Sequence, residues 1–384
     1  MRNAGLDLLR LLAVLLVLFR HLQIPEELHA TAAGGLLAVL RRGGWVGVDL
    51  FFVLSGYLVS ALLFKEYLRD GRIDIGRFLI RRGMKIYPAF WLFLALTLPV
   101  IIWQGHSPSI LNVLSELLFT QNYFQGVWGH TWSLAVEEHF YIGLALLFGL
   151  ALRLSPQGGL HIVPCLFAIL ALICLTLRGH AVAARWPFDA AVHYLPTHLR
   201  VDSLFAGVAL SYATHFRDLG IRAKKVPALL LVSFGFLCLV PAFVWSQYEA
   251  RWLHTIGYLI FSFGGVCLVM AFTRLVHVTS PTLRALTALG AASYPIYLWH
   301  VVVPTWGLLA AKKLLPLEGY AWTFVFAIPG SLIFGWLMAH LTEKPVLRIR
   351  DRFFPSHLAT ATARRDLPRT PKQLPRLLQW RESK

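Results

Sequence analysis

The chain has 384 residues, of which 57% are hydrophobic and only 14% are charged, and this balance excludes an ordinary soluble domain. Its formal net charge of +17 could suit a nucleic-acid binder, but the basic residues gather in particular loops and near the C-terminus. That distribution favours a membrane protein in contact with lipid and no nucleic acid. The four cysteines lie in apolar runs without metal-ligand spacing, so we expect no metal site and no bound cofactor.

The apolar stretches predict an all-α, polytopic membrane protein with about ten transmembrane helices. The expected spans are 6–22, 45–63, 88–103, 131–152, 160–177, 201–215, 226–245, 253–273, 288–310 and 320–341. The first is interpreted as a retained span, since no small-residue cleavage site follows it. An even number of spans places both termini on one side.

Most Lys and Arg residues lie on the side of the termini, although Arg41 and Arg42 do not. We therefore expect a multi-pass protein of the inner (plasma) membrane with both termini cytoplasmic. Residues 1–345 are expected to form one membrane-embedded domain. Residues 346–384, basic and proline-rich, are expected to form a partly disordered cytoplasmic tail.

The first span carries Asp7, Arg10, Arg20 and His21, and ionisable groups inside a span indicate a functional site. Arg10 and His21 are eleven residues apart, which places them within about 20° of one helix face and about 16 Å apart along the axis. One face would then present a cation in one leaflet and an imidazole near the other. In the alternative, Arg10 is only a buried partner of Asp7, and His21 marks the interface.

The stretch 64–87 is expected to be a basic cytoplasmic loop. Arg81, Arg82 and Lys85 stand directly before the third span, at a spacing that lets two or three cations converge on one phosphate. The alternative for this loop is contact with anionic lipid.

Further ionisable residues lie within or beside later spans. Glu137 and Glu138 point about 100° apart on a helix, so we expect one to hold a cation such as Arg200 and the other to face a substrate. Arg200 and Asp202 are too close in sequence to pair well, so each is expected to reach another span. His300 follows a proline-containing segment and could be structural or catalytic.

Six of these stretches resemble motifs of the acyltransferase-3 family of bacterial integral membrane proteins, and they occur in that family's order over residues 6 to about 350. They are Leu6 to Arg10 with His21, Gly47 to Gly56, Arg81 to Pro88, Trp132 to Tyr141, Arg200 to Leu204, and Ser293 to His300. Leu8 replaces a usual glycine, Lys85 stands where arginine is common, and Arg20 precedes the histidine.

The resemblance implies transfer of an acyl group, commonly acetyl, from cytosolic acyl-CoA to a hydroxyl of a carbohydrate or another secreted or lipid-linked acceptor. It also implies essential roles for Arg10 and His21. We expect no appended esterase-like domain of the kind some family members carry, and we therefore expect the membrane unit to handle the acceptor. Acyl-CoA is expected as a co-substrate and not as a bound cofactor.

A positioned imidazole can accept the proton of the attacking hydroxyl, so His21 is expected to be the general base, with Asp49 as its orienting partner. Arg10 with the donor-binding residues Arg81, Arg82 and Lys85 would hold CoA. Five further residues are expected to lie on the acceptor side or in a structural polar network: Glu137, Glu138, Arg200, Asp202 and His300. Direct transfer and a covalent acyl-histidine relay both remain open.

The alternative from another class is a transporter of a small anionic or sugar-like solute. Ionisable groups inside spans, an uneven span and a proline within a helix are also typical of carriers.

Overall fold

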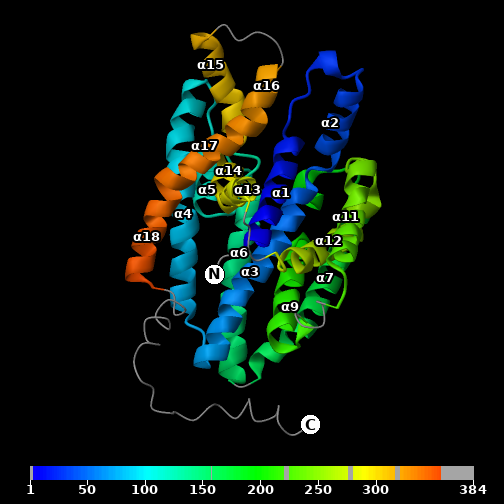
Figure 1. Ribbon diagram of the computed structural model, residues 1–384, viewed down its shortest axis with the longest axis vertical. Coiled ribbons are helices and arrows are strands. Elements are labelled where there is room, and N and C mark those ends of the chain that lie inside the picture. The colour runs from blue at the N-terminus through cyan, green and yellow to red at the C-terminus, as the bar shows by residue number, and fades with distance from the viewer. Residues whose placement is uncertain (1–2, 157, 220–224, 276–279, 316–320, 356–384) are drawn as a thin grey trace.

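The structure, a computed structural model, describes residues 3–156, 158–219, 225–275, 280–315 and 321–355, and the regular elements in these ranges are helices (Figure 1). Five helical stretches are long and apolar enough to cross a membrane. They are α3 (Val46–Asp70), α4 (Ile75–Trp103), α6 (Trp132–Leu154), Gly159–Ala184, which contains α7 (Val163–Ala184), and Ala321–Phe353. The shorter apolar helices α11 (Ala228–Val244) and α12 (Gly257–Phe272) accompany them, so the chain is a polytopic helical membrane protein. The expected number of ten spans stays a prediction.

The prediction of a loop over residues 64–87 is wrong for most of that stretch, which is helical. Helix α3 continues to Asp70 and ends at Gly71, whose φ of 68° is left-handed and suits a residue without a side chain. Helix α4 begins directly after Asp74, whose side chain accepts a hydrogen bond from the backbone N–H of Arg77. The basic motif therefore lies on the first turns of a long helix, because the cap at Asp74 starts that helix well before the apolar stretch.

Two glycines bring α3 and α9 (Val201–Phe216) into close contact. A Cβ atom on Gly56 would lie 1.9 Å from the carbonyl oxygen of Leu204, and one on Gly207 would lie 2.1 Å from that of Val53. Such distances leave no room for any side chain, so the short span expected at 201–215 is held against α3 by direct backbone packing. This contact fixes the position of the polar residues at the start of α9.

The span expected at 288–310 is broken. Helix α13 (Pro281–Ala291) and helix α14 (Ser293–Trp299) are separated at Ala292, and a π-helical turn at Val303–Gly307 precedes α15 (Leu308–Leu314). Prolines remove backbone hydrogen bonds and disturb the regular ladder. In Figure 1 α13 and α14 lie near the centre of the molecule, beside α1 (Ala4–Arg20).

The last helical stretch runs from α16 (Ala321–Val325) through α17 (Ser331–Met338) to α18 (Lys344–Phe353), with π-helical turns at Phe326–Gly330 and Ala339–Glu343. The domain boundary expected after residue 345 therefore falls inside a helix, and α18 packs against α4. Most of the expected tail, residues 356–384, lies outside the described residues.

Candidate functional site

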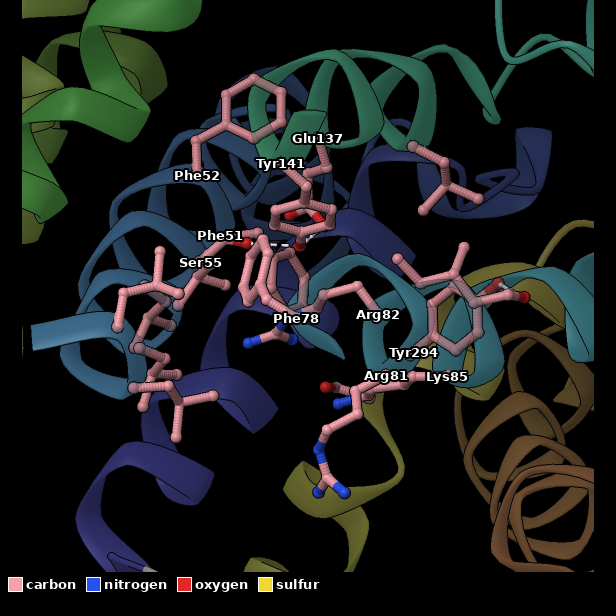
Figure 2. A pocket seen from close by; sticks show the side chains of 18 of the residues that line it. Phe51, Phe52, Ser55, Phe78, Arg81, Arg82, Lys85, Glu137, Tyr141 and Tyr294 are labelled. Carbon is pink, nitrogen blue, oxygen red and sulfur yellow. Dashed lines mark hydrogen bonds between the residues drawn. The ribbon is translucent and has the colours of Figure 1, made fainter. Parts of the chain in front are cut away.

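A cavity of about 620 Å³ opens among α1, α3, α4, α6, α14 and α18, and we call it the basic pocket. Its lining is rich in cations, which Figure 2 shows in part: Arg10, Arg69, Arg77, Arg81, Arg82, Lys85 and Arg350. The structure thus brings four of the residues predicted to bind a donor into one cavity, and adds three arginines. Arg350 was missed at first because it lies in the segment interpreted as a tail.

The cations of the basic pocket differ in how they are held. Arg81 forms an ion pair of 2.9 Å with Asp351 and also donates to the carbonyl of Phe354, so α18 holds it from the side. Arg10 is paired with Asp7 at 2.7 Å. Arg82 lies over the ring of Tyr141, 5.4 Å from its centre, and has no carboxylate bonded to it among the described residues. Unlike Arg10 and Arg81, its guanidinium therefore keeps N–H donors for an anionic ligand.

A chain of hydroxyls and one carboxylate lies beside Arg82 in the basic pocket (Figure 2). The hydroxyls of Ser55 and Tyr141 are 2.7 Å apart, and Tyr141 donates to Glu137 over 2.7 Å. Glu138 accepts a hydrogen bond from Tyr87 instead. The two carboxylates do have separate partners, but neither holds Arg200, and Glu137 faces the basic pocket.

A second cavity of about 740 Å³ contains His21, and we call it the histidine pocket. Aromatic side chains form much of its wall, together with two arginines and one aspartate. These residues are Trp45, Trp132, Trp186, Phe188, Tyr194, Tyr248, Arg20, Arg185 and Asp189. Arg10 and His21, predicted to share one helix face, therefore open into different cavities.

His21 and His300 lie against each other at the inner end of the histidine pocket. Nδ1 of His300 is 2.5 Å from the carbonyl oxygen of Tyr297, so this nitrogen carries the proton, and Nε2 keeps a lone pair. Nδ1 of His21 lies 3.0 Å from the carbonyl of Val17 and 3.1 Å from Nε2 of His300, and both of these atoms are acceptors. His21 therefore carries its proton on Nδ1, which leaves a lone pair on Nε2.

The lone pair on Nε2 of His21 is available to accept a proton. Its ring is accessible from the pocket, and among the described residues Nε2 has no hydrogen-bond partner. A neutral imidazole held in this way can accept a proton at Nε2 while Nδ1–H keeps donating to its two acceptors. His300 is thus a neighbour of His21 and not a distant structural histidine.

The basic pocket and the histidine pocket meet. Val48 and Tyr297 line both of them. The hydroxyl of Tyr297 donates to the carbonyl of His130 over 2.6 Å and lies 2.5 Å from the hydroxyl of Ser133. Tyr297, one of the two shared side chains, is therefore fixed by hydrogen bonds where the cavities adjoin.

Two buried ion pairs lie beneath the histidine pocket. Arg200 binds Asp49 at 2.8 Å, and Arg178 binds Asp202 at 2.7 Å, with all four side chains fully buried. The prediction that Arg200 and Asp202 reach other spans is confirmed. The expectation that Asp49 orients His21 is corrected, because this carboxylate is bound to the Arg200 guanidinium and His21 is held by Val17 and His300.

Sequence reasoning also missed Glu116, which lies on α5 (Ile110–Leu117) between two of the spans. This buried carboxylate accepts hydrogen bonds from the backbone N–H of Trp128 and the hydroxyl of Thr131. Burial raises the pKa of the Glu116 carboxyl to about 7. The Glu116 carboxylate fixes the loop before α6 through these hydrogen bonds. In the sequence, the feature that could have identified it is a single Glu in a loop without Lys or Arg.

Comparison with known proteins gives one family and several relatives. The model of the Acyl_transf_3 family, described as an acyltransferase domain, matches residues 3–340. The chain is 29% identical over 324 residues to O-acetyltransferase OatA of Staphylococcus aureus (strain NCTC 8325 / PS 47), covering 77% of this chain and 49% of that protein. It is 28% identical over 369 residues to a putative O-acetyltransferase of Staphylococcus aureus (strain COL), covering 89% of this chain and 56% of that protein.

The chain thus spans about half the length of the curated relatives it matches. No solved structure matches it at a significant level.

Proposed function

The chain belongs to the acyltransferase-3 family of membrane O-acyltransferases, and from this premise we propose that it moves an acyl group from acyl-CoA in the basic pocket to a hydroxyl in the histidine pocket. The acyl group is acetyl by analogy with the O-acetyltransferases it resembles, and the acceptor is a carbohydrate or another secreted or lipid-linked molecule. The basic pocket and both termini face the cytoplasm of the plasma membrane in this proposal.

One observation carries the proposal: the two cavities share Val48 and Tyr297 as lining residues. Transfer between a donor and an acceptor that enter separately requires the two reacting groups to meet at a near-attack distance. Cavities that share these two lining residues bring the donor and acceptor binding regions next to each other. A cation-rich cavity suits the phosphates of CoA, since guanidinium groups bind phosphate through paired N–H donors.

In the reaction, the acceptor hydroxyl attacks the thioester carbonyl and gives its proton to Nε2 of His21. The new C–O bond replaces the C–S bond, and the CoA thiolate leaves and takes the proton from Nε2 of His21, which returns the imidazole to its neutral form. The positive charge that forms on His21 is stabilised through Nδ1–H by the carbonyl of Val17 and by Nε2 of His300. Arg82 is proposed to hold an anionic group of the donor in the basic pocket.

The test is CoA thiol release by purified protein in lipid nanodiscs, supplied with acetyl-CoA and a panel of sugar acceptors. We expect release to depend on the acceptor and to fall by about 10²- to 10⁴-fold in His21→Ala, which removes the base. Arg82→Gln should raise the KM for acetyl-CoA about tenfold or more, because one charge-assisted contact to phosphate is lost.

Arg153→Gln is the matched control, because Arg153 is an exposed arginine at the C-terminal end of α6 and lines neither cavity. This variant should behave as the wild type. Unchanged turnover in His21→Ala would overturn the assignment of the base. Failure of the wild-type protein both to bind acetyl-CoA and to release thiol would contradict the proposal and favour transport of a small solute.

A further inference from the structure

The histidine pocket contains an arginine that no carboxylate neutralises. Arg20 donates through one terminal nitrogen to the hydroxyl of Tyr248 at 3.1 Å and through the other to the carbonyl of Arg41 at 3.4 Å. Among the described residues, no carboxylate lies within ion-pair distance of this guanidinium. Both present partners are neutral, and an arginine offers five N–H donors, so Arg20 retains donors for a ligand.

The acidic group in the same lining is already bound elsewhere. Asp189 pairs with Arg185 at 3.0 Å and also accepts a hydrogen bond of 2.9 Å from the backbone N–H of Ala191. Arg41 and Arg42 lie close by, at the C-terminal end of α2 (Ala32–Gly43). The charge around the mouth of this pocket is therefore positive.

Membrane topology does not explain this cluster. Arg41 and Arg42 lie on the side of the membrane where few basic residues are expected, and Arg20 stands beside them at the end of the first span. Each lies in the last turn of its helix, where the helix dipole favours a cation and keeps the guanidinium in place without a ligand. Cations concentrated on that side beside a cavity indicate an anionic ligand.

The rest of the wall suits a sugar ring. Trp186, Phe188 and Tyr248 line the histidine pocket. Arg251 lies over the Trp186 ring and His254 stacks on Phe188, so the exposed ring of Tyr248 offers the open aromatic face. Aromatic faces carry partial negative charge and attract the C–H edges of a ring placed over them. Arg20 and His21 both line this pocket, so one ligand there can reach both side chains.

We propose that the acceptor is an anionic sugar, in which a phosphate or carboxylate group binds Arg20 while a hydroxyl of the same molecule meets Nε2 of His21. This inference rests on the proposed function and assigns the charge of the acceptor at that same site. The phosphate of a lipid-linked sugar and the carboxylate of a uronic acid share the required chemistry.

The experiment uses the full chain in zwitterionic nanodiscs with acetyl-CoA and sugars in matched sets. Each set holds a neutral methyl glycoside, the corresponding sugar 1-phosphate and the corresponding methyl uronide, for glucose, galactose and mannose. Ester formation is followed by mass spectrometry, and binding is measured by calorimetry. We expect an anionic sugar to exceed its neutral partner by about 10- to 100-fold in kcat/KM or in affinity, as for a charge-assisted hydrogen bond.

Arg20→Gln should bring the anionic sugar down to the level of its neutral partner, whereas Arg153→Gln should keep the preference. A preference for the 1-phosphates points to a sugar phosphate, and a preference for the uronides points to a carboxylate. Equal values for charged and neutral sugars, a preference that survives Arg20→Gln, or no binding of any anionic sugar would each overturn the inference. Loss of the proposed function itself would differ, because acetyl-CoA binding in the same samples would also be absent.

Discussion

Replacing His300 with phenylalanine tests the assignment of the reacting nitrogen. The imidazole of His300 is buried, and its Nε2 is one of two acceptors for Nδ1–H of His21. A phenyl ring fills similar space but removes this acceptor. The carbonyl of Val17 still fixes the tautomer of His21, so we expect reduced turnover and not complete loss.

The size of the effect follows from the hydrogen bond that is lost. When His21 accepts the proton of the hydroxyl, its bond to His300 becomes charge-assisted, and such bonds contribute about 1.5–3 kcal/mol. In kcat this corresponds to a decrease of roughly 10- to 150-fold, with the KM for acetyl-CoA unchanged. His300→Gln, whose amide oxygen can accept from His21, should recover part of the loss.

The assay is acceptor-dependent CoA release, combined with a double-mutant cycle. In a His21→Ala background, His300→Phe should have no further effect, because its partner is already absent. Wild-type kcat in His300→Phe, or an equal loss with and without His21, would refute the reasoning. Melting temperatures of all variants show whether a loss in kcat reflects unfolding.

Three further outcomes are expected. Asp351→Asn should release Arg81 from its ion pair and lower the KM for acetyl-CoA several-fold, as measured by CoA release. An unchanged KM would show that Asp351 of α18 does not compete with the donor for Arg81. Gly207→Ala should destabilise the protein by about 1–3 kcal/mol or more, since the added Cβ meets a carbonyl of α3 at 2.1 Å, whereas Gly143→Ala, with nothing within 4 Å, should leave the melting temperature unchanged. Burial raises the pKa of Glu116 to about 7, so its contribution to the free energy of unfolding should be fully present below about pH 4.5 and be lost, by on the order of 3 kcal/mol, as the pH rises through 7. Thermal unfolding should show this pH dependence in the wild type and not in Glu116→Gln.

Several parts of the fold and the site follow from the sequence. Long apolar runs are stable in the lipid bilayer, where backbone polar groups must be hydrogen-bonded within the protein. The helical, polytopic class therefore follows from composition. The spacing of 200 and 202 excluded a local ion pair, and each residue does reach another helix. The basic motif of α4 also lies in one cavity, as its spacing indicates.

Other features depended on which helices pack together. Asp49 could have faced His21 or Arg200, and only the close contact of α3 with α9 at Gly56 and Gly207 brings it to Arg200. A sequence records which groups can ionise but not the three-dimensional distances between them.

The sequence by itself determined the membrane class and the family resemblance, together with the ionisable residues that cannot be left in lipid. The tertiary structure decided how those residues are paired and that His300 is a partner of His21. It also decided that two cavities meet at Tyr297. The physical reason is that apolar surface is buried through many weak, non-directional contacts along the chain, whereas a proton or a phosphate is positioned by a few directional contacts between residues far apart in sequence.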